Sequence, residues 1–61
     1  MKIYYAKTYS FDFNSCHVSY FRSRAELNDF FDEIEFYNNS KIIDSGTINL
    51  LPGESVHYYF D

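Results

Sequence analysis

The sequence predicts a small α+β domain in which one helix packs across an antiparallel sheet of three or four strands, in the order β-β-α-β-β. Three observations indicate this class. Apolar residues between positions 27 and 34 recur at helical spacing, the flanking segments are rich in Tyr, Ile, Val and Thr, and 61 residues suffice for one core only. A helix laid on a sheet is the two-layer solution for such a chain. We expect residues 1–61 to form a single domain.

The first two strands are expected to form a hairpin. Residues 2–11 contain neither Gly nor Pro and read as a strand, and polar turn residues follow at Asp12, Asn14 and Ser15. Residues 16–21 then alternate, with Cys16, Val18 and Tyr20 on one side of the strand. We expect the side that carries Val18 to face the core.

The helix is the element with the clearest local signals. Ser23 followed by Glu26 is a capping-box pattern, which marks a helix start. The buried stripe is expected to consist of Leu27, Phe30, Phe31 and Ile34, which follow the i, i+3, i+4, i+7 rule. Asn38, Asn39 and Ser40 are expected to end the helix, because Asn tolerates the left-handed conformation of C-caps.

Two strands are expected after the helix, with one ambiguity. Residues 41–51 form either one long strand kinked near Gly46 or two short strands that turn at residues 44–46. Pro52 and Gly53 are typical of the two central positions of a type II turn. Residues 56–60 alternate in polarity and are expected to form the last strand.

Charge is divided unevenly along the chain. Residues 1–24 carry four Lys or Arg and one Asp, a net charge of +3, whereas residues 25–61 carry eight acids and one Lys, a net charge of −7. Five acids fall on the predicted helix, namely Glu26, Asp29, Asp32, Glu33 and Glu35. Asp29 and Glu33 lie one turn apart with no cation between them, so the helix is expected to carry mutual repulsion.

An acidic helix face attracts basic surfaces and repels nucleic acid phosphates. The expected function is therefore that of a small protein-binding module, which inhibits or regulates a basic nucleic-acid-handling protein by presenting carboxylates in place of DNA phosphates. Phe36 and Tyr37 adjoin the acids and supply aromatic anchors. The expected partner-binding residues are Glu26, Asp29, Asp32, Glu33, Glu35, Phe36 and Tyr37.

In charge, size and shape the chain resembles the general type of small phage-encoded inhibitors that block restriction, CRISPR or DNA-repair enzymes. The resemblance is one of physical type, is carried by the acidic helix alone and involves no specific motif. It implies an anti-defence or anti-repair function in the host cytoplasm, with a nucleic-acid-binding enzyme or complex as the partner.

The first alternative is a structural or interaction module, most simply a homodimer, that uses its aromatic sheet face or sheet edge. A chain this short has little core, and one cysteine, Cys16, cannot close an internal disulfide. Under this alternative the acids of the helix only keep the protein in solution.

The second alternative is a single-stranded nucleic acid binder. Its stacking platform would consist of Tyr4, Tyr5, Tyr9, Tyr20, Tyr58 and Tyr59, with phosphates held by Lys2, Lys7, Arg22 and Arg24. A net charge of −4 and the lack of the glycine and aromatic signature of common sheet-based RNA readers weigh against direct binding of nucleic acid.

Catalysis, cofactors, metals and membranes are not expected. Cys16 and His17 are neighbours on a strand, so their side chains project to opposite faces and cannot act as a nucleophile and base pair. The helix acids lack the glycine-containing loop that wraps calcium. No apolar run approaches the roughly 20 residues that span a bilayer, and the N-terminus lacks a signal-peptide pattern. We therefore expect a cytoplasmic protein.

Overall fold

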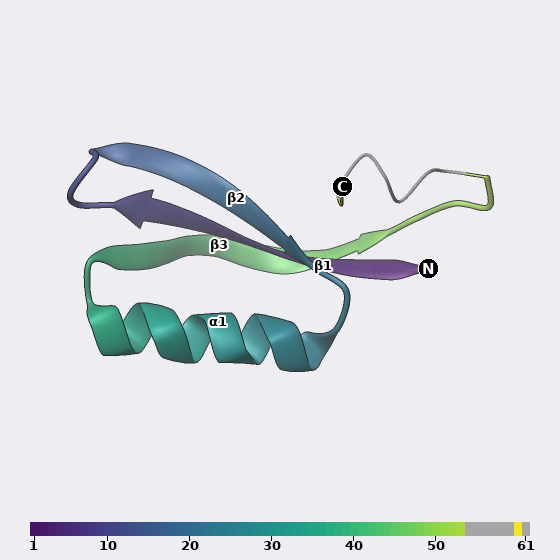
Figure 1. Cartoon of the computed structure of the whole chain (residues 1–61). Helices are drawn as coiled ribbons and strands as arrows, with labels where there is room; N and C mark the ends of the chain where they lie inside the picture. The colour runs from purple at the N-terminus through teal and green to yellow at the C-terminus, as the bar shows by residue number, and fades with distance from the viewer. Residues whose placement is uncertain (54–59, 61) are drawn as a thin grey trace.

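The computed structural model describes residues 1–53 and residue 60 and confirms the α+β class. Its elements are β1 (Lys2–Ser10), β2 (Ser15–Phe21), α1 (Arg24–Tyr37) and β3 (Ser40–Asn49). The three strands form one antiparallel sheet in the order β2-β1-β3, and α1 lies along one side of it (Figure 1). The described order is β-β-α-β, since the last predicted strand, residues 56–60, lies outside the described residues except for Phe60.

The β1–β2 hairpin forms where the turn residues predict it. Its register runs without a break from Tyr4 opposite Phe21 to Ser10 opposite Ser15. Residues 11–14 make the turn, and Asn14 adopts a left-handed conformation with φ 53°, which Asn tolerates better than most residues. The N–H of Phe13 donates to Ser10 Oγ at 3.4 Å and holds the turn to the strand end.

Residues 40–49 form one strand, which settles the alternative that the sequence left open. The β1–β3 register shifts once: Lys7 lies opposite Asp44 while Thr8 lies opposite Ile42, so Ile43 is an extra residue. The irregularity is thus at Ile43 rather than at Gly46. Gly46 has another role, because a Cβ there would lie only 3.1 Å from Tyr5 Cε1, so the Tyr5 ring would have to shift slightly to make room for it.

Both ends of α1 have the predicted caps. Ser23 Oγ accepts from the N–H of Glu26 at 3.2 Å, and Glu26 Oε2 accepts from the N–H of Arg22 at 3.0 Å. Glu26 therefore reaches back one residue further than the standard capping box. At the other end Asn38 is left-handed, with φ 54°, and its N–H donates to the Ile34 carbonyl at 3.0 Å.

The buried apolar core is small. In the part of the chain that the structure describes, the buried apolar side chains are Ile3, Ala6, Leu27 and Leu50, and on β1 Ala6 lies on the side covered by α1 whereas Ile3 lies on the opposite side. All four stripe residues predicted on α1 are buried or half-buried, and every other residue of α1 is exposed, so the predicted stripe is confirmed. Ala6 and Thr8 are small buried residues of the central strand, and they leave room for the larger helix side chains.

The predicted core side of β2 is wrong. Val18 is 46% exposed, whereas Phe21, on the other side of the strand, packs against Phe30 of α1 with ring centroids 5.1 Å apart. The strand register determines which side of β1 faces α1 as well, because Phe21 lies opposite Tyr4 and directly opposed residues share a face. The helix therefore covers the even-numbered residues of β1, and Val18 lies on the face turned away from α1.

We expect Ser23→Ala to lower the free energy of unfolding by about 1 kcal/mol, because the Glu26 N–H loses its acceptor at the first turn of the helix. Urea denaturation followed by circular dichroism would measure the change. Ser45→Ala, an exposed serine on β3, serves as the control and should leave the midpoint nearly unchanged. Equal midpoints for Ser23→Ala and wild type would contradict the assigned cap.

Candidate functional site

The outward side of α1 is formed by residues that lie opposite the buried stripe. Successive helix residues are separated by about 100°, so Asp29, Asp32 and Phe36, at i, i+3 and i+7, line a single side directed away from the core. All three are exposed, and Phe36 is 82% exposed, the highest value among the large apolar side chains described. Helix geometry thus places an aromatic side chain at the end of a row of carboxylates.

We call Asp29, Asp32, Glu33 and Glu35 the acidic ridge. None of these four side chains forms an ion pair or a hydrogen bond within the described part of the chain, and the last turn of α1 contains no basic residue. Glu33 and Glu35 stand near the helix C-terminus, where the macrodipole disfavours negative charge. Glu26, the fifth predicted acid, differs from them because its carboxylate is engaged in the N-cap.

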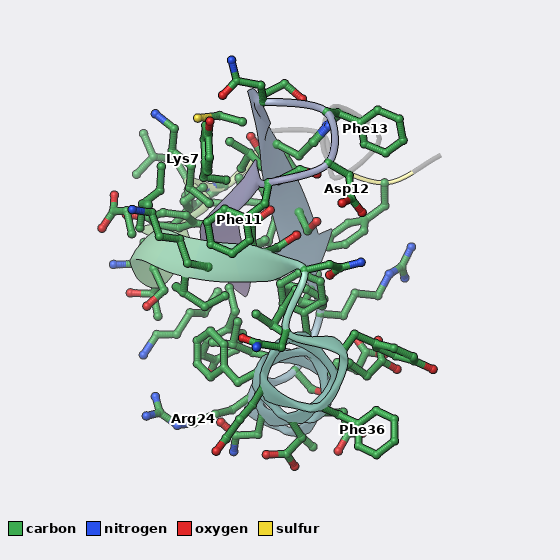
Figure 2. All side chains as sticks on the ribbon, turned by 90° about the vertical axis from the view of Figure 1, so that its left-hand side faces the viewer. Lys7, Phe11, Asp12, Phe13, Arg24 and Phe36 are labelled. Atoms are coloured by element: carbon green, nitrogen blue, oxygen red, sulfur yellow. The ribbon has the colours of Figure 1, made fainter. Side chains whose placement is uncertain are left out.

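Four exposed aromatic residues lie at the same end of the molecule, Phe11 and Phe13 in the hairpin turn and Phe36 and Tyr37 at the end of α1; we call these four residues the aromatic end. The N–H of Phe11 donates to the Asn39 carbonyl at 3.0 Å and joins the two connections. Figure 2 looks onto this end: Phe13 projects from the turn and Phe36 from the helix, on the same side of the molecule, while Phe11 lies over the end of β3. Phe13 is 79% exposed and Tyr37 is 67% exposed.

The predicted partner-binding residues include Phe36 and Tyr37 but not Phe11 and Phe13. Phe36 and Tyr37 are adjacent in the sequence, and their rings form an edge-to-face pair with centroids 5.1 Å apart. Phe11 and Phe13 flank Asp12 in the hairpin turn, and two phenylalanines in a turn are a signal that could have been used. Their closeness to the helix end depends on the tertiary contact between Phe11 and Asn39.

The tyrosines of the proposed nucleic acid platform do not share a face. Tyr4 belongs to the side covered by α1, whereas Tyr5, Tyr9 and Tyr20 project from the opposite side, and Tyr58 and Tyr59 lie outside the described residues. The side turned away from α1 also carries an acid, since Tyr5 Oη donates to Asp44 Oδ2 at 3.1 Å. Lys41 Nζ lies 5.8 Å from the centre of the Tyr9 ring, and Lys7 is exposed.

Other chemistry is sparse within residues 1–53 and residue 60. These residues contain no cluster of three His, Cys, Asp or Glu side chains that could hold a metal ion. Cys16 is exposed as a free thiol, and the neighbouring His17 contacts Ser15 Oγ through Nε2 at 3.4 Å. No described helix combines the length and the apolar character needed to cross a membrane.

Comparison with protein-family models, with curated proteins and with solved structures finds no match for this chain. Its function is therefore inferred from its own residues.

If the acidic ridge is under internal repulsion, reversing one of its charges will stabilise the fold. We expect Glu33→Lys to raise the free energy of unfolding by about 0.5–1 kcal/mol, because a lysine four residues after Asp29 turns repulsion into attraction and suits the helix C-terminus. Chemical denaturation at low salt would measure this change in the free energy of unfolding. Glu26→Lys is the matched control and should destabilise, since it removes the acceptor of the Arg22 N–H. Destabilisation by both variants would contradict a repelling ridge.

The side of the sheet turned away from α1 allows a prediction about pH. The hydrogen bond to Asp44 raises the pKa of the Tyr5 phenol above its ordinary value of 10.0, with smaller contributions from desolvation and from the Asp44 charge. The bond therefore stabilises the fold fully below the unfolded pKa, and this stabilisation is lost as pH rises through the higher folded pKa. In an NMR titration we expect Asp44→Asn to lower the pKa of Tyr5. An unchanged Tyr5 titration would exclude the bond.

Proposed function

We propose that this protein is a small binding module that docks onto a basic protein surface through the acidic ridge together with Phe36 and Tyr37. The observation that carries the proposal is the outward side of α1, where Asp29 and Asp32 lie in line with the most exposed phenylalanine of the described chain. Such a surface combines an apolar anchor with charge on one rigid helix, which is the composition of protein interfaces with strong central residues.

Folding alone does not account for this surface. An exposed helix is normally stabilised by alternating charges at i, i+4, but Asp29 and Glu33 repel each other and have no described cation beside them. Exposure of Phe36 also leaves a large apolar side chain in water, where it contributes nothing to the core. A bound basic partner would remove both the repulsion between the carboxylates and the exposure of Phe36, because it neutralises the carboxylates and covers the ring.

The charge of the ridge selects the class of partner. Four carboxylates on one helix favour a surface rich in Lys and Arg, and such surfaces are common on proteins that handle nucleic acids. Helical turns rise by about 5.4 Å, so successive carboxylates repeat at an interval loosely comparable with phosphates along a DNA strand. We infer that the partner is a nucleic-acid-binding enzyme or complex and that binding would compete with its nucleic acid.

The test is capture of partners from host lysate by immobilised wild-type protein, followed by mass spectrometry and elution with duplex DNA. We expect wild type to retain a nucleic-acid-handling protein that DNA displaces. The variant Asp29→Lys, Asp32→Lys, Glu33→Lys should lose this partner while keeping its circular dichroism spectrum. Phe36→Ser should weaken capture by about tenfold or more if the ring is an anchor.

Two controls separate the ridge from general effects. Asp44→Lys, Glu54→Lys and Asp61→Lys change net charge by the same amount but lie outside α1, so this variant should still capture the partner. Ile43→Ser removes an apolar side chain that is 44% exposed on β3 and should also bind normally. Equal capture by wild type and the ridge variant would refute the proposal.

A further inference from the structure

The hairpin turn between β1 and β2 carries a phenylalanine that the turn itself does not use. Backbone groups and small polar residues form this turn, through the left-handed Asn14 and through the hydrogen bond from the Phe13 N–H to Ser10 Oγ. The ring of Phe11 packs edge-on against Tyr9, with centroids 5.8 Å apart, but the Phe13 ring makes no ring contact with the residues that the structure describes. Folding of the hairpin therefore does not account for an aromatic side chain at position 13.

Phe13 and Phe36 are the two most exposed large apolar side chains of the described chain, at 79% and 82%. They belong to different layers, since Phe13 lies in the hairpin turn and Phe36 on α1, yet Figure 2 shows both rings on the same side of the molecule. The hydrogen bond from the Phe11 N–H to the Asn39 carbonyl, at 3.0 Å, ties the turn to the connection that follows α1. The two rings therefore come from segments that are joined to each other.

These rings are remote from the described residues that adjoin residues 54–59. The Leu50 N–H donates to the Met1 carbonyl at 2.7 Å, and Arg22 Cζ lies 4.7 Å from the centre of the Phe60 ring. Met1 precedes β1 and Arg22 follows β2, so both contacts lie at the end of the hairpin opposite its turn. A seven-residue strand such as β2 is about 20 Å long, and this length separates the two ends of the hairpin.

The outward side of α1 is small for an interface. A helix of 14 residues is about 21 Å long and about 11 Å across with its side chains, so the outward half of this cylinder covers about 360 Å². A specific protein interface buries about 800 Å² on each partner. A stable interface that includes α1 therefore needs further surface, and Phe13 is the most exposed large apolar side chain outside α1 in the described chain.

We propose that Phe13 is a second anchor of the surface formed by the acidic ridge and Phe36, so that a basic protein partner contacts the hairpin turn and α1 together. This inference rests on the function proposed above and extends its binding surface across both layers. Buried aromatic side chains dominate the binding energy of protein interfaces, and each phenylalanine can bury roughly 150–250 Å². The two rings enter apolar pockets of the partner, and the neighbouring carboxylates pair with cations at the rims of these pockets.

Charge at this end of the molecule favours a basic protein over other occupants. Asp12 directly precedes Phe13 and Glu35 directly precedes Phe36, and neither carboxylate forms an ion pair or a hydrogen bond within the described part of the chain. In Figure 2 Lys7 lies on the other side of this end from Asp12 and Phe13. A second copy would bring like charges together, and anionic lipid headgroups would repel them. A surface rich in Lys and Arg complements them.

The first test follows the isotope-labelled protein by NMR while one of two synthetic helical peptides is added. Both peptides carry the same lysines, and a stripe of leucines in one is replaced by serines in the other. We expect the leucine peptide to shift the amide signals of Phe13 and Phe36 together and to bind about tenfold more tightly than the serine peptide. Phe13→Ser should weaken binding of the leucine peptide about tenfold. Ile43→Ser, the matched control at a side chain that is 44% exposed on β3, should bind like wild type.

The outcomes of this test separate the second anchor from the ridge. Circular dichroism of Phe13→Ser should be unchanged, because the ring has no described ring contact to lose. Shifts confined to α1, with Phe13→Ser binding as tightly as wild type, would exclude the second anchor and leave the function proposed for the ridge intact. Dilution-dependent shifts at Phe13 without any peptide would identify a second copy as the occupant and overturn the inference.

The second test uses the photo-cross-linking amino acid p-benzoylphenylalanine in place of Phe13, Phe36 or Ile43 of the full chain, irradiated in host lysate. We expect the first two positions to cross-link to the same nucleic-acid-handling protein and the third to cross-link to none. A partner cross-linked from the helix position alone would refute the second anchor and support the proposed function. If neither of the first two positions cross-links to a nucleic-acid-handling protein, both proposals fail.

Discussion

The pairing of β1 with both of its neighbours is the interaction on which the rest of the structure depends. This strand is bonded along its length to β2 on one side and to β3 on the other. It also supplies Ile3, Ala6 and Thr8, three of the five buried residues in the described chain. Because Ala6 and Thr8 are small, α1 can bring Leu27 and its aromatic neighbours onto the sheet. The position of the acidic ridge therefore follows from side chains on the other layer.

Stability and the candidate surface are carried by different residues of the same helix. Leu27, the N-cap at Ser23 and the C-cap at Asn38 hold α1 in place. Glu26 belongs with them, although its charge alone would group it with the acids. The acidic ridge makes no described hydrogen bond or ion pair, and the described contact of the Phe36 ring is its edge-to-face pair with Tyr37. This division means that the outward side can be altered without loss of the fold.

Local sequence signals predicted the helix and its ends. The features that these signals did not predict depend on pairing between strands that are distant in the sequence. Ser23, Glu26 and Asn38 interact with backbone groups only a few residues away, so both ends of α1 were predictable. The apolar stripe recurs at helical spacing, so the buried side of α1 was predictable as well. The core side of β2 was not predictable, because apolar residues occur on both faces of this strand and the side that is buried depends on the contact between Phe21 and Phe30. The bulge at Ile43 and the approach of Phe11 to Asn39 likewise depend on register, which a single sequence does not encode locally.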